Sequence, residues 1–329
     1  MRTRILGTGM AVPDRVVTND DLARLIDTDD EWIRSRTGIS ERRWASPGET
    51  GVDLALAATS RALEAAGVAA TDLDAIILAT SSPDHFAPGN GVFLQRRLEL
   101  GPIPALDIRA QCAGFIYGLA TADAWIRAGM FRRVLVVGQE QQSTAMDVTT
   151  EGRGTAVIFA DGAGAAVLEA TDDDRGILAV DLHSDGRFAE KLWVDAPGAV
   201  YFPQITPELL AQGKQYLQMD GKEVFRHAVV RMPESVRTVL GRIGKSTDDI
   251  GLLIPHQANL RISEMVQRNL GLRDEQVYNN IMRYGNTTAA TIPIALDECV
   301  RAGRVRDGDL VVLTAFGSGF MWGSAAIQW

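Results

Sequence analysis

Cysteine and histidine are scarce in this sequence: its 329 residues include two cysteines, Cys112 and Cys299, and four histidines. Two cysteines do not build a disulfide framework, and no Cys/His spacing resembles a zinc site. Such sparse use of cysteine is typical of the reducing cytosol, where a lone thiol can serve as a nucleophile. The sequence therefore predicts a cytoplasmic protein without structural disulfides or a metal site.

Long apolar runs and an excess of positive charge are also missing. Gly7, Gly9 and Pro13 interrupt the N-terminal segment, so we expect no signal-peptide core there. No stretch approaches the roughly 18 apolar residues that a membrane helix needs. The formal net charge of −9 argues against nonspecific binding of nucleic acid. What remains is an ordinary globular composition, with 46% hydrophobic residues and a length that favours about two domains.

Short apolar, β-branched runs alternate with alanine-rich stretches along the chain. The runs predict strands at Ala75–Ala79, Ala105–Ile108, Val134–Val137, Ala165–Leu168, Leu252–Ile254 and Leu310–Leu313. The alanine-rich stretches predict helices at Val52–Ala66, Ala113–Ala128, Gly221–Leu240, Arg261–Asn269 and Ala289–Ala302. Because buried runs alternate with helices, we expect a parallel or mixed α/β sheet covered on both faces.

Parts of the second half of the chain repeat the first half. The segment Arg-Ala-Gly129 recurs as Arg-Ala-Gly303, and each is followed by a run that contains Leu-Val-Val. The two glycines lie 174 positions apart, and so do Cys112 and Asn286. Chance recurrence in an alanine-rich chain is one explanation. The recurrence of several pieces in the same order favours two related α/β halves, with a site between them that takes groups from each.

Cys112 lies in the motif Asp-Ile-Arg-Ala-Gln-Cys-Ala-Gly-Phe, where a strand ends and a turn of small residues leads into a helix. A thiol at a helix N-terminus faces unpaired N–H groups and the positive end of the helix dipole, and both favour the thiolate. The thiolate is the form that attacks a thioester. A cysteine flanked by alanine is also typical of a buried core residue, so this motif alone leaves both interpretations open.

Three further motifs lie where predicted strands end or helices begin. His256 follows a buried strand and a proline in Leu-Ile-Pro-His-Gln-Ala-Asn-Leu-Arg. Asn286, in Tyr-Gly-Asn-Thr-Thr-Ala-Ala-Thr-Ile-Pro, can cap a helix or donate a hydrogen bond to an oxyanion. The segment Ala315-Phe-Gly-Ser-Gly-Phe-Met-Trp-Gly allows a ligand to approach the backbone closely. A structural histidine and a helix cap are the alternatives, and the order of the four motifs favours a catalytic site.

Together these motifs identify a resemblance that runs essentially from end to end. The chain resembles the β-ketoacyl-acyl carrier protein synthase III family, chiefly in the segments that begin at Cys112, His256 and Gly285 and in the C-terminal glycine-rich loop. The resemblance implies the duplicated five-layer αβαβα thiolase fold, usually as a homodimer. Residues 1–172 would form the half that carries the nucleophilic cysteine, and residues 173–329 the half that carries the histidine and the asparagine.

The resemblance implies a decarboxylative condensation that initiates fatty-acid synthesis. Cys112 would take an acyl group from an acyl-CoA primer, after which malonyl-acyl carrier protein would lose carbon dioxide and attack that acyl group. His256 and Asn286 would bind the enolate oxygen, and the backbone N–H groups of Cys112 and Ser318 would bind the oxyanion of acylation. The family more often has glycine where Ser318 stands. No metal or redox cofactor is implied.

Binding residues follow from the same resemblance. Trp32 would stack on the adenine of coenzyme A, and Arg36 and Arg153 would bracket the nucleotide. The positions that dock the acidic carrier protein hold Arg226, Arg261 and Arg268. For both sets, solvated side chains without a ligand are the alternative.

The sequence departs from the family at Ala87, where acetyl-primed members commonly have a bulky aromatic residue that closes the primer pocket, partly across the dimer. A close-packed interior does not normally leave so large a void. We therefore hypothesise that a longer or branched acyl chain fills the primer pocket. An inward swing of Phe86 or Phe93 would instead restore the closed pocket.

Two other functions fit parts of the pattern. One is an acyltransferase, or a condensing enzyme of specialised metabolism that joins other acyl partners, although a plain acyltransferase does not require both His256 and Asn286. The other is a catalytically silent partner subunit, which would have lost the nucleophile that stands here at Cys112. The intact trio favours decarboxylative condensation.

Overall fold

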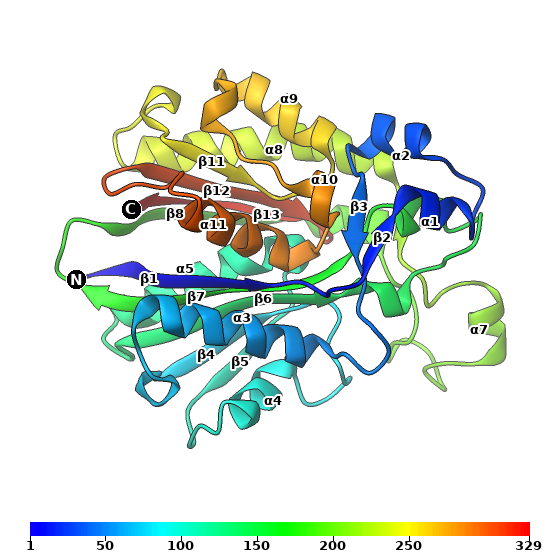
Figure 1. Ribbon diagram of the computed structural model, residues 1–329, viewed down its shortest axis with the longest axis horizontal. Coiled ribbons are helices and arrows are strands. Elements are labelled where there is room, and N and C mark those ends of the chain that lie inside the picture. Colours follow the sequence, from blue (N-terminus) through cyan, green and yellow to red (C-terminus); the bar gives the residue numbers. More distant parts are fainter.

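The computed structural model describes residues 1–329 and stacks them in layers in which helices alternate with sheets (Figure 1). The strands are β1 (Arg2–Ala11), β2 (Val16–Thr18), β3 (Glu41–Arg43), β4 (Ala75–Ala79), β5 (Ala105–Ile108), β6 (Arg133–Gln141), β7 (Asp161–Thr171), β8 (Gly176–Ser184), β9 (Leu192–Trp193), β10 (Gln218–Met219), β11 (Leu252–Pro255), β12 (Leu310–Gly317) and β13 (Met321–Gln328). The α-helices are α1 (Asn19–Ala23), α2 (Asp30–Thr37), α3 (Gly51–Ala66), α4 (Asn90–Arg97), α5 (Gly114–Arg127), α6 (Arg153–Ala156), α7 (Pro207–Ala211), α8 (Gly221–Arg242), α9 (Leu260–Leu270), α10 (Ile281–Tyr284) and α11 (Thr291–Arg301). None of these helices combines the length and the apolar character that a membrane crossing demands.

Two main sheets divide the chain between them. Five strands pair in the order β1-β7-β6-β4-β5, and four pair in the order β11-β12-β13-β8. Strand β4 is parallel to β5 and β6, and β11 is parallel to β12, whereas the other pairs of the two sheets are antiparallel. The prediction of mixed sheets is therefore confirmed. The strands of the first sheet lie within residues 2–171 and those of the second within 176–328, which supports the proposed halves 1–172 and 173–329.

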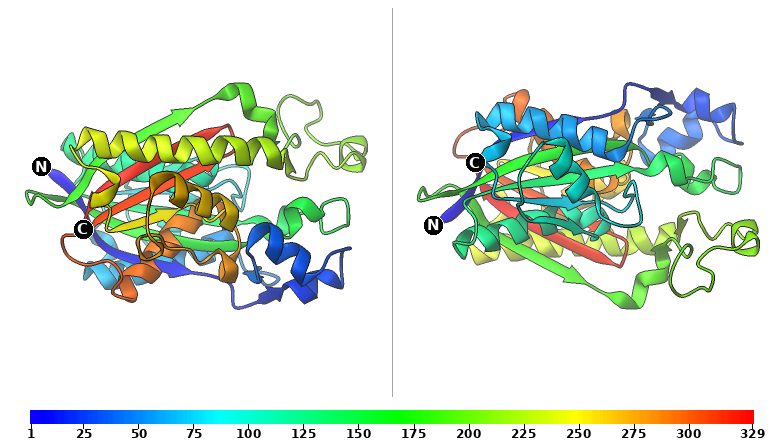
Figure 2. Two further views of the ribbon diagram at one scale, coloured as in Figure 1. Left: turned by 90° about the horizontal axis from the view of Figure 1, so that it is seen from above. Right: turned by 90° about the horizontal axis from the view of Figure 1, so that it is seen from below.

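Helices cover both faces of both sheets. Helices α5 and α11 lie between the two sheets, α3 and α4 pack on the outer face of the five-stranded sheet, and α8 packs with α9 on the outer side of the four-stranded sheet. Figure 2 shows α8 lying along one outer face of the molecule and α3 along the opposite face. This arrangement confirms the five-layer αβαβα fold.

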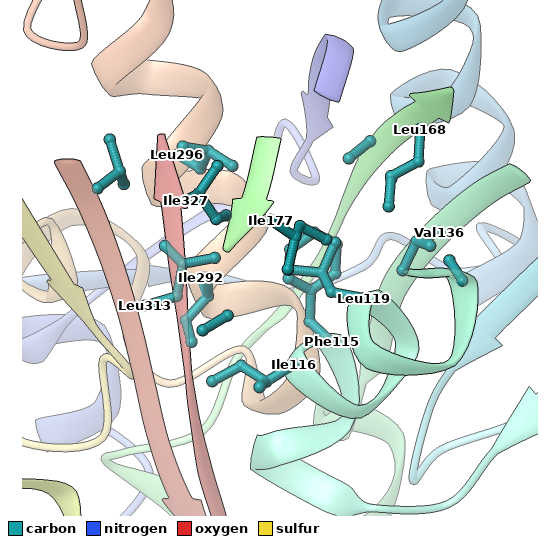
Figure 3. Close-up of a cluster of buried hydrophobic side chains, with 14 of the residues drawn as sticks. Phe115, Ile116, Leu119, Val136, Leu168, Ile177, Ile292, Leu296, Leu313 and Ile327 are labelled. Carbon is teal, nitrogen blue, oxygen red and sulfur yellow. The ribbon is translucent and has the colours of Figure 1, made fainter. Parts of the chain in front are cut away.

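The central core forms where α5 and α11 meet both sheets (Figure 3). Phe115, Ile116 and Leu119 of α5 and Ile292 and Leu296 of α11 are at most 1% exposed. Each fully buried side chain of this kind contributes about 1.5–3 kcal/mol relative to an exposed one. Because the two helices are held on both sides, the turns that precede them are held in place as well.

Every strand and helix predicted from the sequence is present, and β4 and β5 have the predicted bounds. Seven strands were not predicted: β1, β8 and β13 of the two main sheets and the short strands β2, β3, β9 and β10. In β1, a Cβ at Gly7 would lie 2.4 Å from the backbone nitrogen of Ala66, and a Cβ at Gly9 would lie 2.3 Å from the carbonyl oxygen of Ala58. The same glycines that let α3 lie directly on β1 therefore interrupt the apolar run that marks a buried strand.

Candidate active site

One cavity, lined in part by α8, α9 and the ends of β11 and β12, brings together the three residues that the sequence singles out. Cys112, His256 and Asn286 all line it, and each is at most 5% exposed. Most of the remaining wall is apolar and includes Ile158, Phe159, Leu192, Val224, Phe225 and Phe316. The site therefore combines one thiol with two polar side chains in a largely dry setting.

Cys112 lies in a single 3-10 turn, η2 (Gln111–Ala113), between the end of β5 and the start of α5. Gln111 adopts a φ of +48°, a left-handed conformation that is uncommon for any residue except glycine. The glycine-rich loop packs against this turn so closely that a Cβ at Gly317 would lie 2.6 Å from the Cβ of Cys112 and 2.9 Å from its Sγ. Only glycine fits at position 317 without displacing the cysteine.

The surroundings of Cys112 act on the pKa of its thiol in opposite directions. Burial, with a smaller contribution from the nearby carboxylate of Glu140, raises the pKa of the thiol to about 12, although the backbone N–H groups of Cys112 and Ser318 act in the opposite direction. Desolvation therefore opposes the effect expected of the helix N-terminus and outweighs the backbone donors. The Ser318 N–H, which the resemblance assigns to the oxyanion of acylation, is thus close enough to Cys112 to affect the pKa of its thiol.

The side chain of Ser318 has a hydrogen-bond partner of its own. The Ser318 hydroxyl donates to the carbonyl oxygen of Leu192. This bond turns the hydroxyl away from Cys112, so the change from glycine to serine at this position leaves the backbone donor in place.

His256 follows directly on β11, and its backbone N–H donates to the carbonyl oxygen of Thr314 at 2.8 Å. The ring nitrogen Nδ1 lies 2.7 Å from the Oγ1 of Thr291, while Nε2 is buried and has no hydrogen-bond partner. Burial lowers the pKa of the ring to about 3, so His256 is neutral at physiological pH. Because His256 lines the cavity, its unpaired Nε2 can form a hydrogen bond with a ligand there.

Asn286 is held through both its backbone and its side chain. Its N–H donates to the carbonyl oxygen of Ile158 at 2.9 Å, and its own carbonyl oxygen accepts from Ala160 at 3.0 Å. The side-chain Oδ1 accepts from the N–H of Thr288 at 2.8 Å, which leaves the Nδ2 group to donate to a ligand. The residue at the N-cap of α11 is Ala290, so the alternative that Asn286 caps this helix is excluded.

Sequence reasoning missed Glu140, a fully buried carboxylate at the end of β6. It accepts hydrogen bonds from the backbone and hydroxyl of Ser81, from the hydroxyl of Ser82 and from the Nε2 of Gln142. A longer contact of 3.4 Å joins it to the N–H of Ala289. Burial raises the pKa of Glu140 to about 7. An acidic residue three positions after the buried run Val134–Val137 was the signal in the sequence that marks it.

The predicted coenzyme A residues lie together on the surface of the first half. The guanidinium of Arg36 lies 4.4 Å and that of Arg153 lies 4.6 Å from the centre of the Trp32 ring. Arg153 also donates to the carbonyl oxygen of Asp27 at 2.6 Å. An adenine that stacks on Trp32 would therefore take the place of one guanidinium.

The predicted docking arginines are exposed on α8 and α9, two helices that pack against each other. Arg226 is paired with Glu223 at 2.6 Å, whereas Arg261 and Arg268 form no ion pair within the chain.

Ala87 lies on the exposed loop between β4 and α4 and does not line the cavity of Cys112. Phe86 is 74% exposed, so it does not close that cavity in this chain.

No three His, Cys, Asp or Glu side chains gather closely enough to hold a metal ion.

Known proteins resemble the chain along its whole length. The family described as 3-oxoacyl-[acyl-carrier-protein] synthase III matches residues 106–186, and the model of that family's C-terminal part matches residues 240–329. A β-ketoacyl-[acyl-carrier-protein] synthase III from Rhizorhabdus wittichii is 46% identical over 329 residues, covering 100% of this chain and 99% of the relative. One from Roseiflexus sp. is 47% identical over 328 residues, covering 98% and 97%. The crystal structure of the 3-oxoacyl-[acyl-carrier-protein] synthase III from Aquifex aeolicus superimposes with a TM-score of 0.92 at 41% identity, covering 99% of this chain and 100% of that one.

Proposed function

The chain belongs to the β-ketoacyl-[acyl-carrier-protein] synthase III family and is a condensing acyltransferase of fatty-acid synthesis, and we propose that Cys112, His256 and Asn286 carry its reaction. The observation that supports these roles is the shared cavity, in which one thiol faces two side chains that are free to donate hydrogen bonds. The enzyme works in the cytoplasm, which agrees with two cysteines that are both unpaired.

In the first half-reaction, the sulfur of Cys112 attacks the thioester carbon of an acyl-CoA. The carbon–sulfur bond to coenzyme A breaks, and the proton lost by Cys112 balances the proton that the departing thiolate takes up. The carbonyl oxygen becomes an oxyanion during the attack, and the backbone N–H groups of Cys112 and Ser318 stabilise it. Because this exchange of thioesters conserves protons and electrons, it needs no cofactor.

In the second half-reaction, malonyl-acyl carrier protein enters the same cavity. The bond to its carboxylate breaks, carbon dioxide leaves, and the electron pair forms an enolate whose oxygen accepts from His256 Nε2 and Asn286 Nδ2. The enolate carbon attacks the acyl group on Cys112. The Cys112 thiolate then leaves and regains a proton from solvent, and the β-ketoacyl chain remains on the carrier protein.

The two substrates approach over different surfaces. Coenzyme A binds at Trp32, with Arg36 and Arg153 beside the nucleotide, as their cluster around one aromatic ring supports. The acidic carrier protein docks on the exposed faces of α8 and α9, where Arg226, Arg261 and Arg268 supply positive charge on a chain whose net charge is −9. Exposed charges of this kind act mainly on the rate of association.

A homodimer completes the primer pocket. Strand β5 is an edge of its sheet, and Leu106 on it is 38% exposed, so a second copy can continue the sheet and cover this apolar side chain. Helix α4 packs against β5, and the loop that carries Phe86 and Ala87 precedes α4. The small side chain of Ala87 then serves the pocket of the partner, where it leaves room for a primer larger than acetyl.

The test is the mass of the intact protein after exposure to a panel of acyl-CoAs, followed by addition of malonyl-acyl carrier protein. We expect an acyl adduct that malonyl-acyl carrier protein removes, with branched or longer chains at least as effective as acetyl. The matched variant Ala87→Phe should shift the preference towards acetyl. Strong preference for acetyl in the wild-type protein would contradict the larger primer, and an adduct that persists would contradict the condensation.

A further inference from the structure

A continuous hydrogen-bonded path joins the two side chains that face the enolate. The Thr288 N–H donates to Asn286 Oδ1. The Thr288 carbonyl oxygen accepts from the backbone N–H of Thr291 and lies 3.1 Å from the Thr291 hydroxyl oxygen. The same Thr291 hydroxyl lies 2.7 Å from Nδ1 of His256. The turn that includes Thr288, η7 (Thr288–Ala290), therefore connects both residues, and Thr291 is the only side chain that contacts the His256 ring through a hydrogen bond.

The Thr291 hydroxyl can donate its single proton to either of two acceptors, Nδ1 of His256 or the Thr288 carbonyl oxygen. If the hydroxyl donates to the Thr288 carbonyl, Nδ1 of His256 must carry the ring proton and Nε2 presents a lone pair to the cavity. If the hydroxyl donates to Nδ1, the ring proton lies on Nε2 and the cavity meets a donor. Burial lowers the pKa of His256 to about 3, so the ring is neutral and only one of the two nitrogens is protonated.

Three observations favour the second arrangement. The contact of Thr291 with Nδ1 is shorter than its contact with the Thr288 carbonyl, 2.7 Å against 3.1 Å. The Thr288 carbonyl already accepts from the backbone N–H of Thr291, whereas Nδ1 has no other partner. The neighbouring Asn286 presents its NH2 group because its Oδ1 is occupied, and a second donor beside it suits an anionic oxygen.

We propose that Thr291 is a positioning residue whose hydroxyl donates to Nδ1 of His256 and so keeps the proton on Nε2, where it meets the enolate oxygen. The proposal rests on the function given above, since only a developing oxyanion needs this donor. Thr291 itself is 2% exposed, and the turn before it is held by Thr288 at a φ of +49° and by the contact of Ala289 with Glu140. The hydroxyl therefore has little freedom to find another acceptor.

The test compares Thr291→Val, which keeps the shape and removes the hydroxyl, with Thr291→Ser, which keeps the hydroxyl. Acylation of Cys112 and discharge by malonyl-acyl carrier protein are followed separately by intact mass. We expect Thr291→Val to acylate like the wild type and to discharge more slowly by a factor on the order of 10², as for other lost oxyanion donors. Thr291→Ser should restore most of the discharge rate.

A control variant separates this effect from the general cost of replacing a buried threonine. The hydroxyl of Thr59 in α3 is buried without a hydrogen-bond partner, so Thr59→Val should leave both half-reactions unchanged. Discharge by Thr291→Val at the wild-type rate would overturn the proposal. Failure of the wild type to discharge its acyl group would instead contradict the proposed function.

A spectroscopic measurement on the wild-type protein decides the matter without any variant at Thr291. The chain has only four histidines, so 15N-labelled histidine gives few ring signals, and His256→Asn assigns the one of interest. We expect long-range proton–nitrogen correlations to show His256 neutral and protonated on Nε2 in the wild type. Protonation on Nδ1 in the wild-type protein would overturn the proposal, including in the case that Thr291→Val does not fold.

Discussion

The turns before α5 and α11 occupy corresponding places in the two halves, but they place chemically different side chains in the same cavity. Both helices end in register with the repeat, at Arg127 and Arg301, and both are followed by a left-handed glycine, Gly129 at φ +70° and Gly303 at φ +65°. The turn before α5 carries a thiol, and the segment before α11 carries an amide at Asn286. Packing of the helices therefore fixes the positions of Cys112 and Asn286. Local hydrogen bonds determine which atom of each side chain faces the cavity.

The two turns also differ in what their neighbours do. Around Cys112 the backbone N–H groups of Cys112 and Ser318 lower the pKa of the thiol, and Gly317 of the glycine-rich loop packs directly on the cysteine. Around Asn286 the backbone occupies the side-chain oxygen and leaves the nitrogen free. In the proposed mechanism, the first half thus holds the group that forms a bond to substrate, and the side chains of the second half stabilise charge.

The largest expected effect separates the two cysteines, which share a pKa raised to about 12 by burial. Cys299 is fully buried in α11 within the central core, whereas Cys112 lines the cavity. We expect Cys112→Ala to abolish the acyl adduct and Cys299→Ala to retain it. An adduct of wild-type size on a folded Cys112→Ala protein, measured by intact mass, would show that the assignment of the nucleophile is wrong.

A smaller but still large effect is expected at Gly317. An added methyl group would overlap Cys112, which costs about 1–3 kcal/mol of stability and displaces the nucleophile. Gly317→Ala should therefore slow acylation roughly tenfold or more, since even small misplacement of a reacting group is costly. At Gly241 in α8 an added Cβ meets nothing within 4 Å, so Gly241→Ala is the matched control and should acylate normally. Equal rates for the two variants would refute the close packing of the loop on Cys112.

The smallest effect concerns the charge beside the nucleophile. Because Glu140 raises the pKa of Cys112, Glu140→Gln should lower that pKa and increase the thiolate fraction at a given pH. Alkylation of Cys112 by iodoacetamide should accelerate with rising pH in both proteins, by about tenfold for each unit below the pKa. At a fixed pH near 8 the variant should react about threefold faster or more. A variant that reacts more slowly, with Cys112 still in place, would reverse the sign assigned to Glu140.

Much of this comparison could be predicted from the sequence. Apolar runs gave β4 and β5 their bounds, and the offset that carries Cys112 onto Asn286 indicated two halves with a common site. Strand β1 was not predicted because Gly7 and Gly9, which allow close contact with α3, interrupt its run of apolar residues. Glu140 and Thr291 were not predicted either, since their importance lies in hydrogen bonds to residues more than 30 positions away.

The thiol of Cys112 shows a different limit. The start of a helix can be recognised in the sequence, and it predicts a lowered pKa for the Cys112 thiol. The depth of burial and the nearby carboxylate of Glu140 cannot be recognised there. These two effects outweigh the backbone donors, and both depend on tertiary packing: Gly317 of the second half packs on Cys112, and Glu140 comes from β6 of the half that carries Cys112. Local motif and tertiary environment therefore have to be combined before the state of a nucleophile can be stated.

The central claim is that the first half bonds to the acyl group while the second half stabilises the enolate. The most direct test loads His256→Ala and Asn286→Ala with an acyl group, adds malonyl-acyl carrier protein and follows the adduct by intact mass in a single turnover. We predict that both variants acquire the acyl group as the wild type does and discharge it more slowly by a factor of roughly 10²–10³. Discharge at the wild-type rate by either variant, or loss of acylation in a variant that remains folded, would contradict this division between the halves.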